Sequence, residues 1–198
     1  MMAIAPKSSA LLDDLKHPAG RVACQTPFYH WLLSSGDMPS QLTVRLSDPW
    51  TGDGDAGRLL GRGVLRANGA SLALDGRFWD MAAANPFWLQ TVHSFGWMRD
   101  LRAAGGDTSR RIARKLADCW MDLYDRWHPE IWRADIMGDR IAIWLSFYDF
   151  FCGSADEEFQ RRYFASLNRQ ARHLSRQFPS GLSGVALLKA ARGLIYAG

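Results

Sequence analysis

The stretch Ile141-Ala142-Ile143-Trp144-Leu145-Ser146-Phe147-Tyr148-Asp149-Phe150-Phe151 is apolar or aromatic on most sides of a helix. A helix with that pattern is buried against more than one neighbour. The sequence therefore predicts a helix from about Asp135 to Phe151 that lies inside a multi-helix array. Aromatic side chains left exposed in such an array would also suit a carbohydrate cleft.

Amphipathic segments on both sides of this stretch extend the array from Asn85 to Gly198. Apolar residues recur at helical spacing in each segment, so four further helices are expected. The first begins at Asn85-Pro86, and the fourth helix of the array follows the capping-box pattern Ser154-Ala155-Asp156-Glu157. Short breaks make successive helices antiparallel neighbours. These breaks are Gly105-Gly106, His128-Pro129, Gly153 and Pro179.

The chain before Asn85 has a different character. Residues 1–48 contain four prolines and are expected to form a leader or a loosely docked segment. Residues 49–84 are expected to form a turn-rich loop and a small β-hairpin. The hairpin turn is Asn68-Gly69, because both central positions of a type I′ turn need positive φ. The expected fold is mainly α: an incomplete (α/α) toroid-type array of antiparallel helical hairpins over residues 85–198, preceded by the hairpin.

Composition argues against several classes of protein. A hydrophobic content of 47% and a charged content of 22% are typical of a globular protein. The net charge of +4 is dispersed and no nucleic-acid-binding motif accompanies it, so nucleic acid is not expected as a partner. Three widely spaced Cys and five scattered His form no metal-binding pattern, so neither metal nor cofactor is expected.

No sequence feature points to a membrane. The chain has neither a run of about 18 apolar residues nor a signal-peptide pattern at its first residues. The expected location is therefore cytoplasmic by default, or periplasmic if the start codon is misassigned.

Several landmarks follow one another in order along residues 45–198. They are Asp48-Pro49-Trp50, Gly61-Arg62-Gly63, Phe78-Trp79-Asp80, Phe95-Gly96-Trp97-Met98-Arg99-Asp100-Leu101, Trp132-Arg133, Arg140-Ile141-Ala142-Ile143-Trp144-Leu145, Tyr148-Asp149-Phe150-Phe151 and Arg169-Gln170-Ala171-Arg172-His173-Leu174. This order resembles the N-terminal part of bacterial heparinase II/III-like proteins, a polysaccharide lyase family.

The resemblance implies an (α/α) toroid followed by a β-sandwich, and β-elimination on uronate-containing acidic polysaccharides. That reaction needs a base that removes the C5 proton and an acid that protonates the leaving oxygen. The catalytic segments of the family and its β-sandwich have no counterpart in this chain. Enzyme activity of the chain alone is therefore uncertain, and its catalytic residues are unknown.

Four residues are the candidate substrate contacts under this resemblance: Trp97, Arg140, Trp144 and Tyr148. An arginine can pair with a sugar carboxylate, and an aromatic ring can stack on a pyranose. For each of them a structural role is the favoured alternative. His93 is expected to be structural or on the surface, and His173 to be solvated.

Two other functions remain open. A non-catalytic helical interaction module would bind a partner through the apolar edge at Leu194-Ile195-Tyr196. That partner would be a missing C-terminal toroid and β-sandwich part, or a second copy of the chain. A polyanion-binding domain would instead use the basic face of the fourth helix of the array. This face carries Arg161, Arg162, Arg169 and Arg172.

Overall fold

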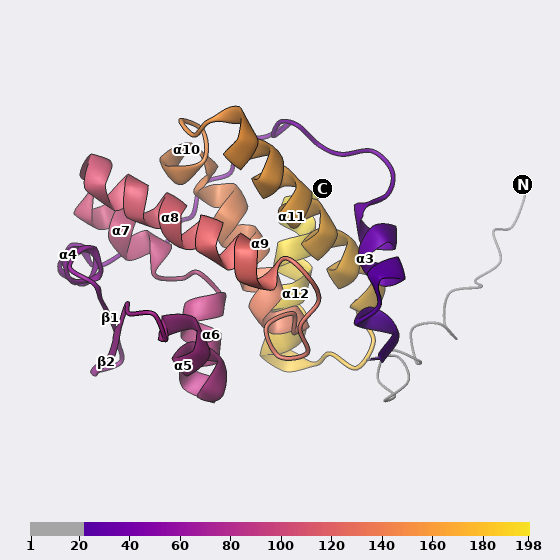
Figure 1. Cartoon of the computed structure of the whole chain (residues 1–198), viewed down its shortest axis with the longest axis horizontal. Coiled ribbons are helices and arrows are strands. Elements are labelled where there is room, and N and C mark those ends of the chain that lie inside the picture. The colour runs from indigo at the N-terminus through magenta and orange to yellow at the C-terminus, as the bar shows by residue number, and fades with distance from the viewer. Residues whose placement is uncertain (1–21) are drawn as a thin grey trace, which may run out of the picture.

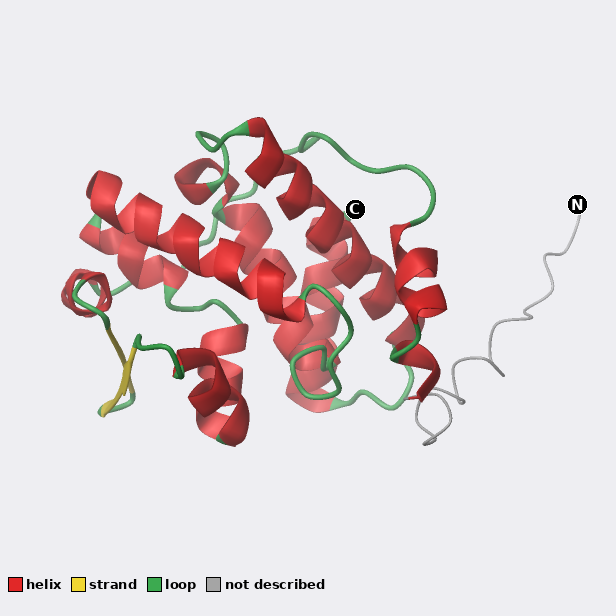
Figure 2. Ribbon diagram, viewed as in Figure 1, coloured by secondary structure: helices red, strands yellow, loops and turns green. Residues whose placement is uncertain are grey.

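The computed structural model describes residues 22–198, and it is mostly helical with one small antiparallel sheet, as the sequence predicts (Figures 1 and 2). Its helices are α3 (Pro27–Ser34), α4 (Gly54–Gly61), α5 (Phe78–Ala84), α6 (Pro86–His93), α7 (Met98–Ala104), α8 (Gly106–Tyr124), α9 (Ala134–Ser146), α10 (Tyr148–Phe151), α11 (Glu157–Gln177) and α12 (Gly184–Ala197), and its strands are β1 (Val64–Ala67) and β2 (Ala70–Ala73). None of these helices is long and apolar enough to cross a bilayer.

The long helices α8, α9, α11 and α12 pack across one another, with α3 beside the end of α11 and the hairpin on the opposite side of the molecule (Figure 1). Aromatic rings fill the space between them. The ring of Trp144 on α9 lies 5.5 Å from Trp120, 5.3 Å from Phe95 and 5.6 Å from Tyr163. Such pairs stabilise a core beyond the area that they bury. The prediction that α9 is buried on more than one side is confirmed.

Two helices are shorter than the sequence predicts because the chain bends at a buried phenylalanine. The helix expected from Asn85 to Gly105 is interrupted at Phe95, whose φ of 62° lies in the left-handed region and separates α6 from α7. The helix expected to reach Phe151 ends at Ser146, and Phe147 separates α9 from α10. Both phenylalanine side chains are buried. Long-range packing therefore overrides the local helical pattern at these two places.

The expected hairpin is confirmed, with Asn68 and Gly69 both at positive φ in its turn. Strand β1 pairs with β2 from Val64 opposite Ala73 to Ala67 opposite Ala70. The region expected to be a turn-rich loop also contains α4. Asp53 caps this helix, because its carboxylate accepts hydrogen bonds from the backbone N–H groups of Asp55 and Ala56.

Glycines allow two pairs of helices to approach until their backbones touch. A Cβ on Gly193 of α12 would lie 2.6 Å from the Cα of Gly138 on α9, and a Cβ on Gly57 of α4 would lie 2.0 Å from the carbonyl oxygen of Asp100 on α7. No larger residue fits at such a separation. The α9–α12 contact therefore depends on the two glycines that face each other across it.

Helix α3 lies within the segment expected to be a leader. Residues 1–21 of that segment lie outside the described residues. Leu33 of α3 is buried, and the guanidinium of Arg172 on α11 donates hydrogen bonds to the backbone carbonyls of Leu33, Ser35 and Asp37. These contacts hold α3 and the turn after it against α11.

Two histidines are buried in the core. Trp120 Nε1 donates a hydrogen bond of 3.1 Å to Nδ1 of His93, and the Tyr29 hydroxyl lies 2.6 Å from Nδ1 of His173. The expectation that His173 is solvated is wrong, because its side chain is buried and faces Tyr29 and Trp132 inside the array. Burial lowers the pKa of each histidine to about 3. Both rings are therefore neutral near pH 7.

Gly193→Ala should destabilise the protein by about 1–3 kcal/mol, although alanine is the better helix former by about 1 kcal/mol, because its methyl group forces α9 and α12 apart. Urea unfolding measures this loss. Gly61→Ala is the matched control: its added Cβ would meet only the Ile112 side chain, at 3.8 Å. Equal stability of Gly193→Ala and the wild type would contradict the close contact.

The stability of the protein should fall as the pH drops below about 6.5, the pKa of an unfolded histidine. The pKa of His93 and His173 is lower in the folded state, so the unfolded state takes up more protons. Between pH 7.5 and 5.5 the loss should be about 1.4 kcal/mol for each histidine. Urea unfolding at the two pH values measures it.

His93→Asn isolates one of these contributions, because an asparagine oxygen can accept from Trp120 but does not titrate. Whatever the substitution costs at pH 7.5, the further loss on going to pH 5.5 should be smaller than in the wild type by about 1.4 kcal/mol. An unchanged pH dependence would mean that the pKa of His93 in the folded protein is close to that of an unfolded histidine.

Candidate functional site

The four residues expected to contact a substrate have internal roles in the structure. Trp97 donates a hydrogen bond of 3.0 Å to the carbonyl oxygen of Val92, and the ring of Trp144 stacks on Tyr163. The Tyr148 ring is 8% exposed and is covered by the guanidinium of Arg45, 4.8 Å from its centre. A role of these residues in binding a ligand stays a prediction.

Arg140, the fourth of these candidate residues, is fully buried, and its guanidinium binds uncharged oxygen atoms. Its Nε donates to Oε1 of Gln170 at 2.6 Å, and its Nη1 donates to the carbonyl oxygens of His93 at 2.9 Å and Ile131 at 3.2 Å. The guanidinium also lies 4.2 Å from the ring centre of Trp120, a cation–π contact. Burial lowers the pKa of Arg140 to about 9, which leaves it charged near pH 7. The guanidinium is therefore enclosed by protein atoms.

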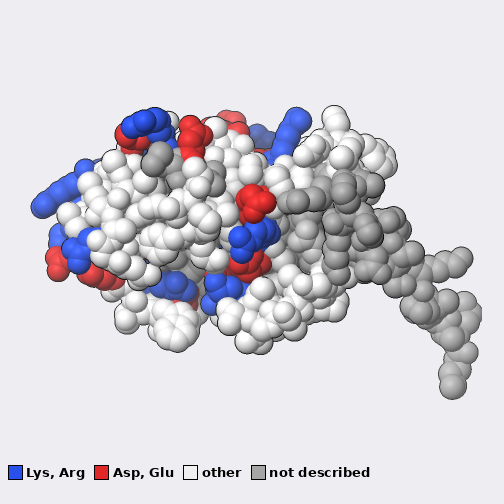
Figure 3. Space-filling view, turned by 90° about the horizontal axis from the view of Figure 1, so that it is seen from below, with Lys and Arg blue, Asp and Glu red and all other residues white. Residues whose placement is uncertain are grey.

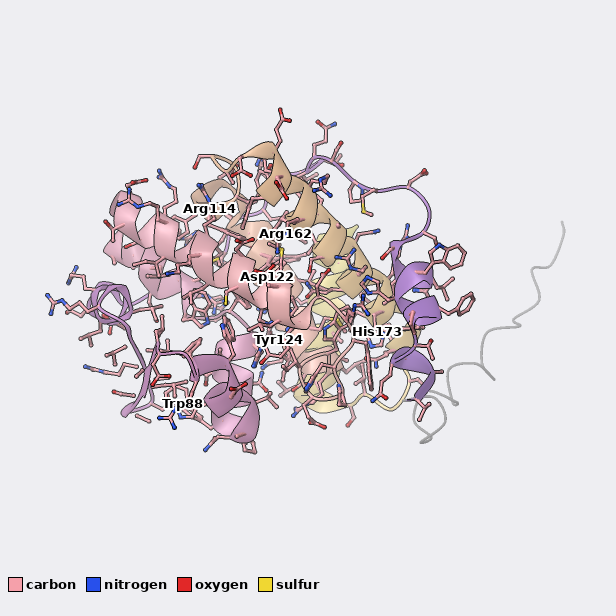
Figure 4. All side chains as sticks on the ribbon, in the orientation of Figure 1. Trp88, Arg114, Asp122, Tyr124, Arg162 and His173 are labelled. Atoms are coloured by element: carbon pink, nitrogen blue, oxygen red, sulfur yellow. The ribbon has the colours of Figure 1, made fainter. Side chains whose placement is uncertain are left out.

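The arginines expected to form a polyanion-binding face are mostly committed to other contacts. Arg162 bridges Asp118 and Asp122 of α8, and Arg169 pairs with Asp125; Figure 4 labels Arg162 and Asp122. Arg172 binds backbone carbonyls near α3. Arg161 alone among the four is highly exposed, with 73% of its side chain accessible. The expected basic face is therefore replaced by ion pairs that tie α11 to α8.

Charged side chains elsewhere on the surface are also mixed in sign. On the face drawn in Figure 3, basic and acidic groups lie next to each other with wide uncharged areas between them. No group of three His, Cys, Asp or Glu side chains in residues 22–198 is placed to hold a metal ion. A candidate site must therefore be sought among exposed apolar side chains and hollows.

The outer face of α12 exposes a row of large apolar side chains, which we name the α12 stripe. Val185, Leu188 and Ile195 are 67%, 69% and 76% exposed. They point outward because the small residues Ala190 and Gly193 occupy the opposite face, against α9. Their separations of three and seven residues place them along one side of the helix. Exposed apolar rows of this kind mark interaction surfaces.

An apolar groove lies at the end of the stripe. It encloses about 440 Å³ between the segment after α3, α11 and the last turn of α12. Leu42, Val44, Phe164 and Leu167 line it together with Ile195. The groove extends the apolar surface of α12 toward its C-terminal end.

A second, polar hollow lies beside the stripe, and we name it the α12 hollow. It encloses about 280 Å³ and is lined by Trp50, Ser94, Gly96, Arg99, Asp139, Ile143, Lys189 and Arg192. Helix α12 supplies Lys189 and Arg192, α9 supplies Asp139, and α7 supplies Arg99. The break between α6 and α7 at Phe95 allows the backbone of Ser94 and Gly96 to line it. The hollow is thus built where three helices meet.

Positive charge predominates in and around the α12 hollow. Asp139 receives two cations, Lys189 Nζ at 2.7 Å and Arg192 Nη2 at 2.6 Å. Arg99 pairs with Asp48 through two parallel hydrogen bonds of 3.1 and 2.8 Å, and Arg102 approaches the carbonyl oxygen of Asp48 at 3.5 Å. Four basic side chains thus surround two carboxylates.

The pKa of Asp48 reflects this setting. Burial raises it, but hydrogen bonds from Arg99 and from the backbone N–H of Trp50, together with the nearby positive charge, lower it more. The net direction is downward, so Asp48 is ionised near pH 7. Arg192 has spare donor capacity, since its one side-chain hydrogen bond among residues 22–198 runs from Nη2 to Asp139 while 33% of its side chain is exposed.

Sequence reasoning did not find the α12 hollow. Its charged residues come from positions 99, 139, 189 and 192, and no local motif joins them. One signal was present in α12, where Lys189 and Arg192 alternate with the apolar residues of the stripe. That pattern describes a helix with an apolar row beside a basic one.

Comparison with known proteins finds one similar protein to report, from a bacterium. No family model matches the chain, and no solved structure matches it. The chain is 29% identical over 147 residues to FtsZ-localized protein C of Caulobacter vibrioides. The match covers 73% of this chain and 25% of that protein, so the chain spans about a quarter of the length of this relative.

This match corrects the functional expectation drawn from the sequence. A relative named for its localisation with FtsZ contradicts the resemblance to heparinase II/III-like lyases. It also contradicts the expected β-elimination reaction and the expected acidic polysaccharide partner. The landmarks behind that resemblance were mainly aromatic and arginine residues. The structure gives many of them roles in a helical core, such as Trp97, Trp132, Arg140 and Trp144.

Proposed function

We propose that this chain is a non-catalytic helical module that localises with FtsZ by binding it through the outer face of α12. The observation that carries the proposal is the 29% identity, over 147 residues, to a protein named for its localisation with FtsZ. A cytoplasmic location, which the sequence predicts by default, is part of this proposal.

The arrangement of the helices supports a binding role for α12. Most polar and aromatic candidates identified in the sequence bind other parts of the chain, whereas the α12 stripe leaves three large apolar side chains exposed. Burying each of them contributes about 1.5–3 kcal/mol. Association itself costs about 4–15 kcal/mol. The stripe alone therefore supports at most weak binding, and tight binding requires further contacts beside it.

We also propose that these helices form part of an incomplete (α/α) toroid, which is a more specific arrangement than a helical array. Among the described elements, α12 packs on α9 and α11 and leaves its opposite side open. In a toroid-type order of hairpins, α12 is then an edge helix. A partner helix packed on the stripe would continue that order.

A fluorescent fusion of this chain should overlap with labelled FtsZ in the cells from which the chain comes. The double substitution Val185→Asp with Leu188→Asp should disperse the fusion, because each carboxylate would be desolvated in the proposed interface. Leu123→Asp on α8 is the matched control, since Leu123 is also an exposed leucine, at 56%. It should leave the overlap unchanged.

Two results would contradict this proposal in different ways. A wild-type fusion spread evenly through the cell would exclude localisation with FtsZ. Overlap that survives in the double variant, with helical content unchanged by circular dichroism, would exclude the α12 stripe as the binding surface.

A further inference from the structure

We infer that the α12 hollow binds a carboxylate from an acidic segment of the partner protein, while the α12 stripe packs against apolar residues of the same segment. This inference rests on the proposed function and identifies the chemistry of the partner. The hollow and the stripe lie on neighbouring rows of one helix, because Lys189 follows Val185 and Arg192 follows Leu188 by four residues. A single bound segment can therefore reach both.

The charge of the hollow selects an anion. Arg99, Arg102, Lys189 and Arg192 lie against Asp48 and Asp139, and Asp100 lies near Arg99, so one positive charge is left without a carboxylate. Asp135, the acidic residue at the start of α9, is paired with Arg133, and the Gln90 amide lies between it and Lys189. Complementary charge of this kind fixes the register of a complex and raises its association rate. A cationic ligand would be repelled from the same place.

The hollow also offers hydrogen-bond donors that the chain does not use. Arg192 donates to Asp139 through Nη2, and 33% of its side chain is exposed. A partly exposed guanidinium can bind a carboxylate with charge-assisted hydrogen bonds.

The size of the hollow fits a side chain of a protein segment. Its volume of about 280 Å³ lies just below the range of about 300–1,000 Å³ that is typical of small-molecule pockets, which suits a single side chain. Trp50 forms part of its wall and is 63% exposed. Tryptophan is among the residues that contribute most at protein interfaces, where its ring is covered by the partner. Trp50 thus offers the partner an apolar face beside the cations.

In the free chain Asp139 pairs with both cations of α12, Lys189 and Arg192. An incoming carboxylate must share these cations with Asp139 or displace Asp139 from them. Removing Asp139 should therefore strengthen binding, whereas removing a cation should weaken it. A purely structural role of the Asp139 cluster predicts a different result, because any of these substitutions would then disturb the fold and weaken binding.

The test is co-sedimentation of the chain with FtsZ polymers, using purified FtsZ from the same organism. Lys189→Gln and Arg192→Gln should each lower the affinity at least about tenfold, the loss expected when one partner of a charged interfacial pair is removed. Asp139→Asn should raise the affinity several-fold. Arg161→Gln is the matched control, because it removes one exposed cation of α11 far along the chain from the hollow, and it should have no effect.

The outcomes separate this inference from the proposed function. If wild-type chain does not co-sediment, FtsZ is not the partner and both fall together. If the wild type co-sediments and the three hollow variants match it, the inference alone is wrong. Weaker binding by Asp139→Asn with circular dichroism unchanged would also overturn it, since the carboxylate would then help binding.

A vesicle assay decides whether the anion comes from a lipid surface. The same variants are mixed with phosphatidylglycerol vesicles and sedimented without FtsZ. We expect no binding that depends on Lys189 or Arg192, because a half-enclosed hollow suits a protruding side chain. Vesicle binding that both substitutions abolish would assign the hollow to lipid headgroups and overturn the inference.

Discussion

The buried guanidinium of Arg140 is the constraint around which the helices are arranged. A charge enclosed in the core needs compensation, and no carboxylate pairs with this one among the described residues. The compensation comes from the Gln170 amide, from the carbonyl oxygens of His93 and Ile131, and from the ring of Trp120. These groups belong to α11, to the end of α6, to the segment before α9, and to α8. The partners of this one charge, whose Nη2 has none among residues 22–198, thus position four parts of the chain relative to α9.

The same charge restricts what else the core can contain. The pKa of His93 is lowered first by burial and then by the neighbouring Arg140, so a second positive charge is excluded there. Trp120 contacts both the His93 ring and the Arg140 guanidinium, since its N–H donates to His93 while its ring faces Arg140. The aromatic residues that led us to expect a sugar cleft are therefore the packing and hydrogen-bonding partners of a buried polar cluster.

Sequence patterns predicted the parts of the fold that local chemistry determines. Asn68-Gly69 indicated the hairpin, and Asn85 was expected to cap a helix, as its side chain does for α6. The capping box of α11 was nearly right, but Asp156 caps the helix in place of Ser154. The breaks at Phe95 and Phe147 could not be predicted, because they depend on rings packed far along the chain. The paired state of Arg162 and the burial of Arg140 depend on tertiary contacts in the same way.

The position of the candidate surface follows from packing rather than from any motif. Gly138 and Gly193 bring α9 and α12 into backbone contact, which turns the small residues of α12 inward. The large residues Leu188 and Ile195 must then face outward, and Lys189 and Arg192 must lie at the side, within reach of Asp139. A helix that packs through glycine thus presents an apolar row and a basic row together. A partner segment with apolar and acidic residues at matching positions is the complement of that surface.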